Sequence, residues 1–215
     1  MSGIMLNVVG GTFAPSAPTV IGQAFGGGFY AGQIGVSSVA THYLIVGPIA
    51  SADNASKQWK NATTATPGAD SDIDGPQNTA DMVADGNATV YPAAHFCNDL
   101  VIGGFSDWYM PAKNELEVCY YNLKPTTTIN ITIAGGVNPN AIPARASNYT
   151  ISDPAQTSAT DFRDTGAEDF AAGYYNASTE YSATSAYFQN FDYGAQSFGG
   201  KTGANRVRAI RRIAV

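Results

Sequence analysis

The sequence predicts an α+β fold built from small twisted antiparallel sheets, two or three short helices and long loops. Apolar stretches broken by glycines in residues 21–48 indicate short strands, because glycines within strands mark bulges or close backbone contacts. The 21 residues Gly103–Leu123 combine a glycine turn, an aromatic stretch, a proline and an amphipathic pattern. From Tyr174 onward, aromatic and polar residues alternate between glycine turns, which is typical of a strand meander.

Along the chain, residues 1–20 look like an extended arm, and residues 21–215 are expected to form one domain. Two short helices are predicted, over residues 79–84 and 93–100. Asn78 with Asp81 three residues later suits a capping arrangement for the first of them, and Gly86 suits its end.

The segment Gly103–Leu123 predicts a strand that leads into a helix. Gly103 and Gly104 favour a turn, and Phe105–Met110 is expected to be a short strand. Pro111 suits the first position of a helix. The helix would present one apolar stripe, formed by Leu116, Cys119, Tyr120 and Leu123. Trp108 is expected in the core. The residues that follow, 126–169, read as a long loop region with one strand candidate at 130–134.

Two blocks of the sequence resemble the C-terminal domain family of collagen-like bacterial adhesins, whose relatives also occur in phage tail proteins. The family carries a segment like GGYSDWRLPTKDEL, matched here by Gly103, Gly104, Ser106, Asp107, Trp108, Pro111, Lys113, Glu115 and Leu116. A later block like YWSSTE…A…F…G…K…VRAVR is similar to residues 174–180, Ala186, Phe191, Gly194, Lys201 and residues 207–211. Tyr175 and Asn176 stand where the family usually has tryptophan and serine.

The resemblance covers roughly residues 70–213 and implies a C-type-lectin-like fold. Such folds are distantly related to formylglycine-generating enzymes, whose chemistry needs a specific cysteine pair. Cys97 and Cys119 lie in separate predicted helices and are expected to be buried free thiols, although a disulfide stays geometrically possible. No phosphate loop or nucleophile motif is present, so an enzyme is not predicted.

The composition limits the partners of the chain. Only 13% of its residues are charged and its net charge is −6, which disfavours nucleic acid. Its late arginines are expected to pair with carboxylates, and no stretch is apolar enough for membrane insertion. Residues 1–20 contain no lysine or arginine, so they do not read as a secretory signal. An extracellular composition without such a signal favours a phage virion protein, and it also fits a chain whose signal was removed.

One segment is a candidate calcium site. Asp70, Asp72, Asp74, Gly75, Asn78 and Asp81 occupy positions 1, 3, 5, 6, 9 and 12 of a calcium-loop pattern. The twelfth residue is the short Asp and no helix is predicted before the loop. The alternative is therefore a turn that leads into a capped helix. Ca²⁺ is the one cofactor that the sequence suggests.

The second candidate site is an aromatic segment, Phe170–Phe198, which holds nine of the 22 Tyr and Phe residues. Tyrosines with neighbouring amides and carboxylates suit sugar rings, which have apolar faces and hydroxyls. About half of the segment is expected to be core, with Phe188 and Phe191 inside and Tyr181 and Tyr193 exposed. The predicted ligand-binding residues are Tyr174, Tyr175, Asn176, Glu180, Tyr181, Tyr187, Asn190 and Tyr193.

These observations favour a phage tail-fibre or tail-tip protein in the virion. It would bind a host-surface glycan or protein through the aromatic segment and the loops of residues 125–173. The arm would contact other virion proteins or sister subunits, in a homo-oligomer that is commonly a trimer. The alternatives are a decoration or collar protein without a receptor role and, less favoured, a glycan hydrolase.

Overall fold

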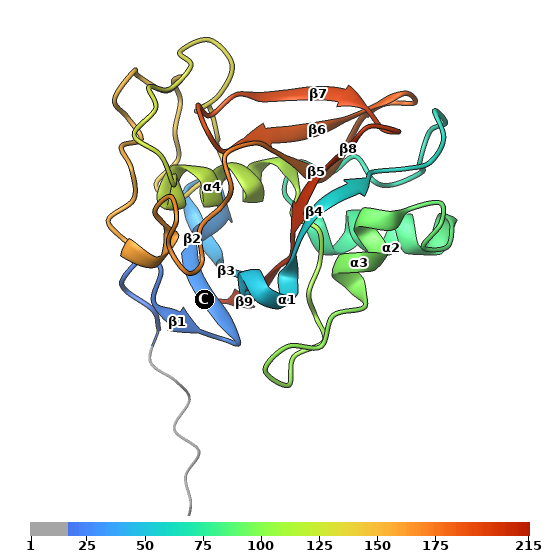
Figure 1. Ribbon diagram of the computed structural model, residues 1–215, viewed down its shortest axis with the longest axis horizontal. Helices are drawn as coiled ribbons and strands as arrows, with labels where there is room; N and C mark the ends of the chain where they lie inside the picture. The colour runs from blue at the N-terminus through green and yellow to red at the C-terminus, as the bar shows by residue number, and fades with distance from the viewer. Residues whose placement is uncertain (1–16) are drawn as a thin grey trace, which may run out of the picture.

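A four-stranded antiparallel sheet joins the first three strands to the last strand of the protein. The computed structural model describes residues 17–215. The strand order is β1-β2-β3-β9, so the last strand pairs with β3 (Figure 1). The strands are β1 (Ala24–Phe25), β2 (Gly28–Val36), β3 (Val39–Val46) and β9 (Ile210–Ala214). The glycine-interrupted strands expected in residues 21–48 are thereby confirmed.

A second sheet of five strands is mixed and not antiparallel as predicted, because β5 and β8 run parallel where they meet. Its order is β4-β8-β5-β6-β7. The strands are β4 (Asp53–Gln58), β5 (Tyr174–Ser182), β6 (Ser185–Asn190), β7 (Gln196–Gly200) and β8 (Ala204–Arg208). Only Ala209 separates β8 from β9, so the last stretch of chain runs from one sheet into the other (Figure 1).

Short helices pack around the two sheets. They are α1 (Ile49–Ala52), α2 (Gly75–Asp85), α3 (Pro92–Asn98), α4 (Lys113–Leu123) and the 3₁₀ turn η1 (Thr160–Phe162). The α4 helix lies centrally and packs on β2 and on β5–β6 (Figure 1). The predicted α+β class is confirmed. In the described residues, no helix has the length and apolar character needed to cross a bilayer.

The predicted start of α2 was wrong. The helix begins at Gly75, four residues before the predicted start, and Asp74 is its N-cap residue, accepting a hydrogen bond from the backbone N–H of Gln77. Asn78 is instead buried inside the helix. Asp is as good an N-cap residue as Asn, so residue type alone did not exclude a helix that begins four residues earlier.

The segment Gly103–Leu123 is confirmed as framework but differs in detail. Gly103 and Gly104 have φ of 61° and 82°, as the predicted turn requires. Residues 105–110 form no regular strand and make only isolated bridges, one of them between Tyr109 and Ile210. Pro111 lies before the helix, whose first residue is Lys113. Residues 130–134 likewise form no strand.

The core confirms several expectations about individual residues. Trp108 is 2% exposed, and its indole N–H donates to the Phe105 carbonyl at 3.1 Å. The four stripe residues of α4 are all buried. Cys97 and Cys119 are buried free thiols, and burial raises the pKa of both.

Buried polar residues hold the long loop between α4 and η1 in place. The Lys124 ammonium donates to Thr128 O, to Asn130 Oδ1 at 2.7 Å and to Pro154 O. Glu117, on α4, pairs with Arg145 and accepts from Tyr149. Because the Lys124 ammonium and the Glu117 carboxylate find their partners inside the protein, the loop is ordered without regular secondary structure. The predicted arm of residues 1–20 lies mostly outside the described residues.

Candidate functional site

The structure does not bring the predicted calcium ligands together. Asp72 pairs with Lys113 at 2.9 Å, and Asp74 pairs with Arg212 at 3.0 Å. Asp81 accepts from the Gln77 amide at 2.9 Å, and Asp70 is exposed with no recorded partner. Across residues 17–215, no three acidic, His or Cys side chains are grouped closely enough to hold a metal ion.

Asn78 shows why the calcium pattern forms a different structure. Its amide accepts from Ser71 N at 3.0 Å and donates to Ser71 O at 2.7 Å, within the buried core. This pair of bonds fixes the turn before α2. The helix begins inside the pattern, and its Asn78 and Asp81 side chains bond to Ser71 and Gln77. The segment forms a turn that leads into a helix, as in the alternative, but the helix is capped by Asp74 and not by Asn78.

Three of the predicted ligand-binding residues are buried and do not form a surface. Tyr175 is fully buried, and its hydroxyl accepts from Ala171 N and from Arg206 Nε, both at 3.0 Å. Asn176 and Asn190 are 4% and 3% exposed and bond to backbone groups or neighbouring amides. The prediction failed for these three because residues 175–179 of β5 are buried on both faces of the strand, and Asn190 lies at the buried end of β6.

Glu180 serves a buried ion pair. Its carboxylate lies 2.9 Å from the ammonium of Lys201, whose side chain is fully buried, and accepts from Thr66 N at 2.7 Å. The Lys201 ammonium also lies 4.7 Å from the centre of a Trp59 ring. Glu180 therefore joins the second sheet to the loop after β4, and it is mostly unavailable to a ligand.

The exposed aromatic residues form two clusters. Tyr187 and Phe188 are consecutive in β6, so their rings lie on opposite faces of the sheet. The Tyr181 cluster comprises Tyr181, Tyr187 and Phe198, and the Tyr174 cluster comprises Tyr174, Phe188 and Tyr193. Phe188, expected in the core, is only half-buried, whereas Phe191 is fully buried as expected.

The Tyr181 cluster presents the more exposed rings. Tyr181 and Phe198 are 49% and 45% exposed, and their rings stack 3.6 Å apart with planes 9° from parallel. Tyr187 meets Tyr181 edge-on at 5.4 Å. The ammonium of Lys113 lies 4.5 Å from the centre of the Tyr187 ring, from the α4 side. The result is a rigid apolar surface beside a cation.

The Tyr174 cluster is held by a hydrogen bond. The hydroxyls of Tyr174 and Tyr193 lie 2.9 Å apart, and Tyr174 contacts Phe188 edge-on at 4.9 Å. Tyr174 is 41% exposed and Tyr193 is half-buried. Because two of its polar groups already bond to each other, this cluster offers fewer free hydroxyls to a ligand.

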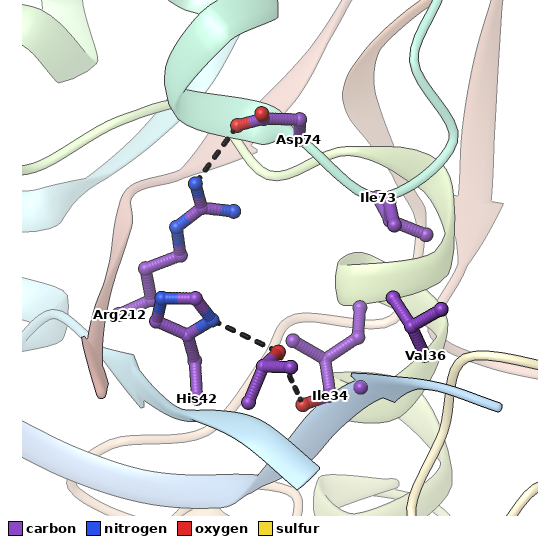
Figure 2. Close-up of a pocket in the computed structure, with 8 residues that line it drawn as sticks. Ile34, Val36, His42, Ile73, Asp74 and Arg212 are labelled. Carbon is purple, nitrogen blue, oxygen red and sulfur yellow. Dashed lines mark hydrogen bonds and ion pairs between the residues drawn. The ribbon is translucent and has the colours of Figure 1, made fainter. Parts of the chain in front are cut away.

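A pocket that the sequence did not reveal lies on another part of the molecule. Figure 2 shows this Arg212 pocket, about 230 Å³ in volume, between the β2–β3 hairpin, the loop before α2 and strand β9. Its lining residues are Ile34, Gly35, Val36, Thr41, His42, Ile73, Asp74 and Arg212. Arg212 and His42 lie on one side, and Ile73 and Val36 face them across the pocket (Figure 2).

The charges beside this pocket are nearly balanced. Arg212 bonds to Asp74, and its other nitrogen lies 3.9 Å from the fully buried carboxylate of Glu115. Burial raises the pKa of Glu115 to about 7, although Ala112 N–H and the Tyr109 hydroxyl donate to it. Burial and the nearby Arg212 lower the pKa of His42, which favours its neutral form.

Sequence reasoning missed this pocket because its parts are distant in the chain. His42 and Arg212 come together only because β9 returns to pair with β3, where Leu44 lies opposite Arg212. The expected pairing of the late arginines with carboxylates is confirmed, although Arg208 and Arg211 are buried and do not face solvent. The partners of Arg206, Arg208, Arg211 and Arg212 are respectively Asp53, Glu168, Asp107 and Asp74.

Comparison with known proteins agrees with the two sequence blocks. Comparison with curated protein sequences gave no significant match. The Lcl C-terminal domain family, an adhesin-like family, matches residues 52–211, well over half of the chain. The match begins after β3, so the first three strands precede it. The chain therefore belongs to the Lcl C-terminal domain family.

Proposed function

We propose that this protein is a phage virion component, in a tail fibre or tail tip, that binds a glycan on the host surface. The adhesin-like family supports a binding role. The low charge and the polar, glycine-rich loops suit an extracellular particle. Host glycan, neighbouring virion proteins and sister subunits are the partners, and catalysis, nucleic-acid binding and membrane insertion are not part of the role.

The observation that carries the proposal is the stacked, half-exposed pair of Tyr181 and Phe198. Two large rings held in one orientation lose little conformational entropy when a ligand covers them. Sugar rings have apolar faces that stack on such surfaces, while Lys113 beside Tyr187 can donate to hydroxyls. Each contact is weak, so several copies in a trimer would gain avidity.

The test is whether excess protein blocks phage adsorption to host cells. The double variant Tyr181→Ser/Phe198→Ser should lose most of the blocking activity. The matched control, Tyr174→Ser/Tyr193→Ser, changes two rings of the other cluster and should keep it. Measurements with and without EDTA should agree, because the predicted calcium ligands are dispersed.

Two results would contradict the proposal. Wild-type protein that neither adheres to cells nor blocks adsorption would indicate a decoration or collar protein. Release of reducing sugar from host polysaccharide, abolished by changing one carboxylate, would indicate a glycan hydrolase. Light scattering of the purified protein tests the trimer separately, and a monomer would remove the avidity argument.

A further inference from the structure

The Arg212 pocket combines an apolar wall with polar atoms that have no partner among the described residues. Asp74 Oδ1 accepts from Arg212 and from Gln77 N, whereas its Oδ2 makes no hydrogen bond within residues 17–215. Thr41 donates its hydroxyl proton to Ile34 O at 3.2 Å and lies 3.0 Å from His42 Nδ1. His42 Nδ1 must therefore carry the proton, which leaves Nε2 as an acceptor.

The polar wall thus offers acceptors and donors within one small space. The acceptors are Asp74 Oδ2 and His42 Nε2, and Arg212 keeps N–H groups beyond the one that bonds Asp74. A hydroxyl group, which both donates and accepts, can satisfy such a mixed set. Ile73 and Val36 on the other wall suit a flat apolar face (Figure 2).

The volume of the pocket and the charges around it restrict the kind of ligand that fits. The pocket is smaller than the roughly 300–1,000 Å³ typical of drug-sized ligands, which indicates a single ring. One guanidinium faces Asp74 and, behind it, Glu115, so a ligand carboxylate would gain little. A neutral ring that bears hydroxyls does not depend on a charge interaction with Arg212, so the nearby carboxylates do not weaken its binding.

We propose that the Arg212 pocket binds one neutral pyranose ring, as a site separate from the Tyr181 cluster. The Lys113–Asp72 ion pair connects the two regions, because Lys113 contacts Tyr187 and Asp72 immediately precedes Ile73. A glycan end in the pocket and aromatic contacts elsewhere would then give the protein two kinds of sugar contact.

The chain has only two histidines, which allows a site-specific test. His42 lines the pocket, whereas His95 lies on α3 with its Nε2 2.8 Å from Gly86 O. The imidazole NMR signals of both are followed while methyl glycosides of glucose, galactose, mannose and N-acetylglucosamine are added. We expect the His42 signals to shift and saturate with at least one sugar, at millimolar concentrations, while those of His95 stay fixed.

A blocking variant makes the test specific. Val36 is 52% exposed at the pocket, so Val36→Trp should fill the pocket without unfolding the protein and abolish the His42 shift. Val101→Trp, at a 72% exposed valine that does not line the pocket, is the matched control and should keep it. Unchanged melting temperatures and His95 signals verify folding.

Three outcomes would overturn the proposal: no His42 shift with any of the four glycosides, a shift that survives in Val36→Trp, or tighter binding of methyl glucuronide than of methyl glucoside. The Tyr181→Ser/Phe198→Ser variant should keep the His42 shift while losing adsorption blocking. Failure of the pocket and failure of the host-binding role are therefore distinguishable.

Discussion

Two aromatic-rich segments of this protein have opposite roles. In Gly103–Leu123, the largest rings point inward, and Trp108, Tyr109 and Tyr120 are all buried. In Phe170–Phe198, buried rings such as Tyr175 alternate with exposed ones such as Tyr181. The rings of the first segment, before α4 and on it, pack into the hydrophobic core, whereas strands β5–β7 leave part of their aromatic surface in solvent. Aromatic content alone therefore does not identify a binding surface.

The largest loss of stability is expected from a substitution in the first segment, Gly103–Leu123. Trp108→Ala removes a buried indole and leaves a cavity, so unfolding free energy should fall by about 3–5 kcal/mol. Urea denaturation monitored by circular dichroism measures the loss. A change below about 1 kcal/mol would contradict the framework role of this segment.

The second-largest effect is a pH dependence of stability that comes from Glu115, the buried carboxylate of the same segment. Glu115 has a pKa of about 7 in the folded protein, above its usual 4.5, so the folded state holds its proton more tightly. The contribution of Glu115 to the free energy of unfolding is fully present below pH 4.5, and it is lost as the pH rises through about 7. The total loss is on the order of 3 kcal/mol.

The variant Glu115→Gln isolates this contribution. It cannot ionise, so its unfolding free energy should fall less than that of the wild type between pH 5 and pH 8. Denaturation at several pH values gives the difference between the two slopes. Parallel curves for the two proteins would show that Glu115 is already ionised at pH 5.

A matched pair of tyrosine variants tests the second segment. Tyr175→Phe removes a buried hydroxyl that accepts from Ala171 N–H and Arg206, leaving two part-buried donors without this partner, and should cost about 1–2 kcal/mol. Tyr181→Phe removes a hydroxyl at a half-exposed side chain and should change stability by less than about 0.5 kcal/mol. Equal losses of unfolding free energy in the two variants would contradict the buried position of Tyr175 and the exposed position of Tyr181.

The smallest effect is expected from calcium. The carboxylates of Asp72, Asp74 and Asp81 are turned to different partners, so millimolar Ca²⁺ should leave the melting temperature unchanged. Differential scanning fluorimetry with and without EDTA measures this. A calcium-dependent rise would show that the loop before α2 can rearrange around a cation.

Local patterns predicted much of the framework. The glycine turn, the apolar stripe of α4 and the buried Trp108 follow from residue type and spacing within one segment. The calcium pattern misled because Asp-rich turns and calcium loops use the same residues, and helix packing decided between them. Likewise, β5 is irregular where it pairs with β6, so strict alternation could not assign its residues to faces.

The sequence by itself determined the α+β class, the family and the framework segment, because each depends on residue types and on spacings within short blocks of the chain. Only the tertiary structure decided which tyrosines are exposed and that His42, Asp74 and Arg212 line one pocket. The physical reason is that β9 returns to pair with β3 and brings residue 212 beside residue 42. Such long-range pairing leaves no local signal in the sequence.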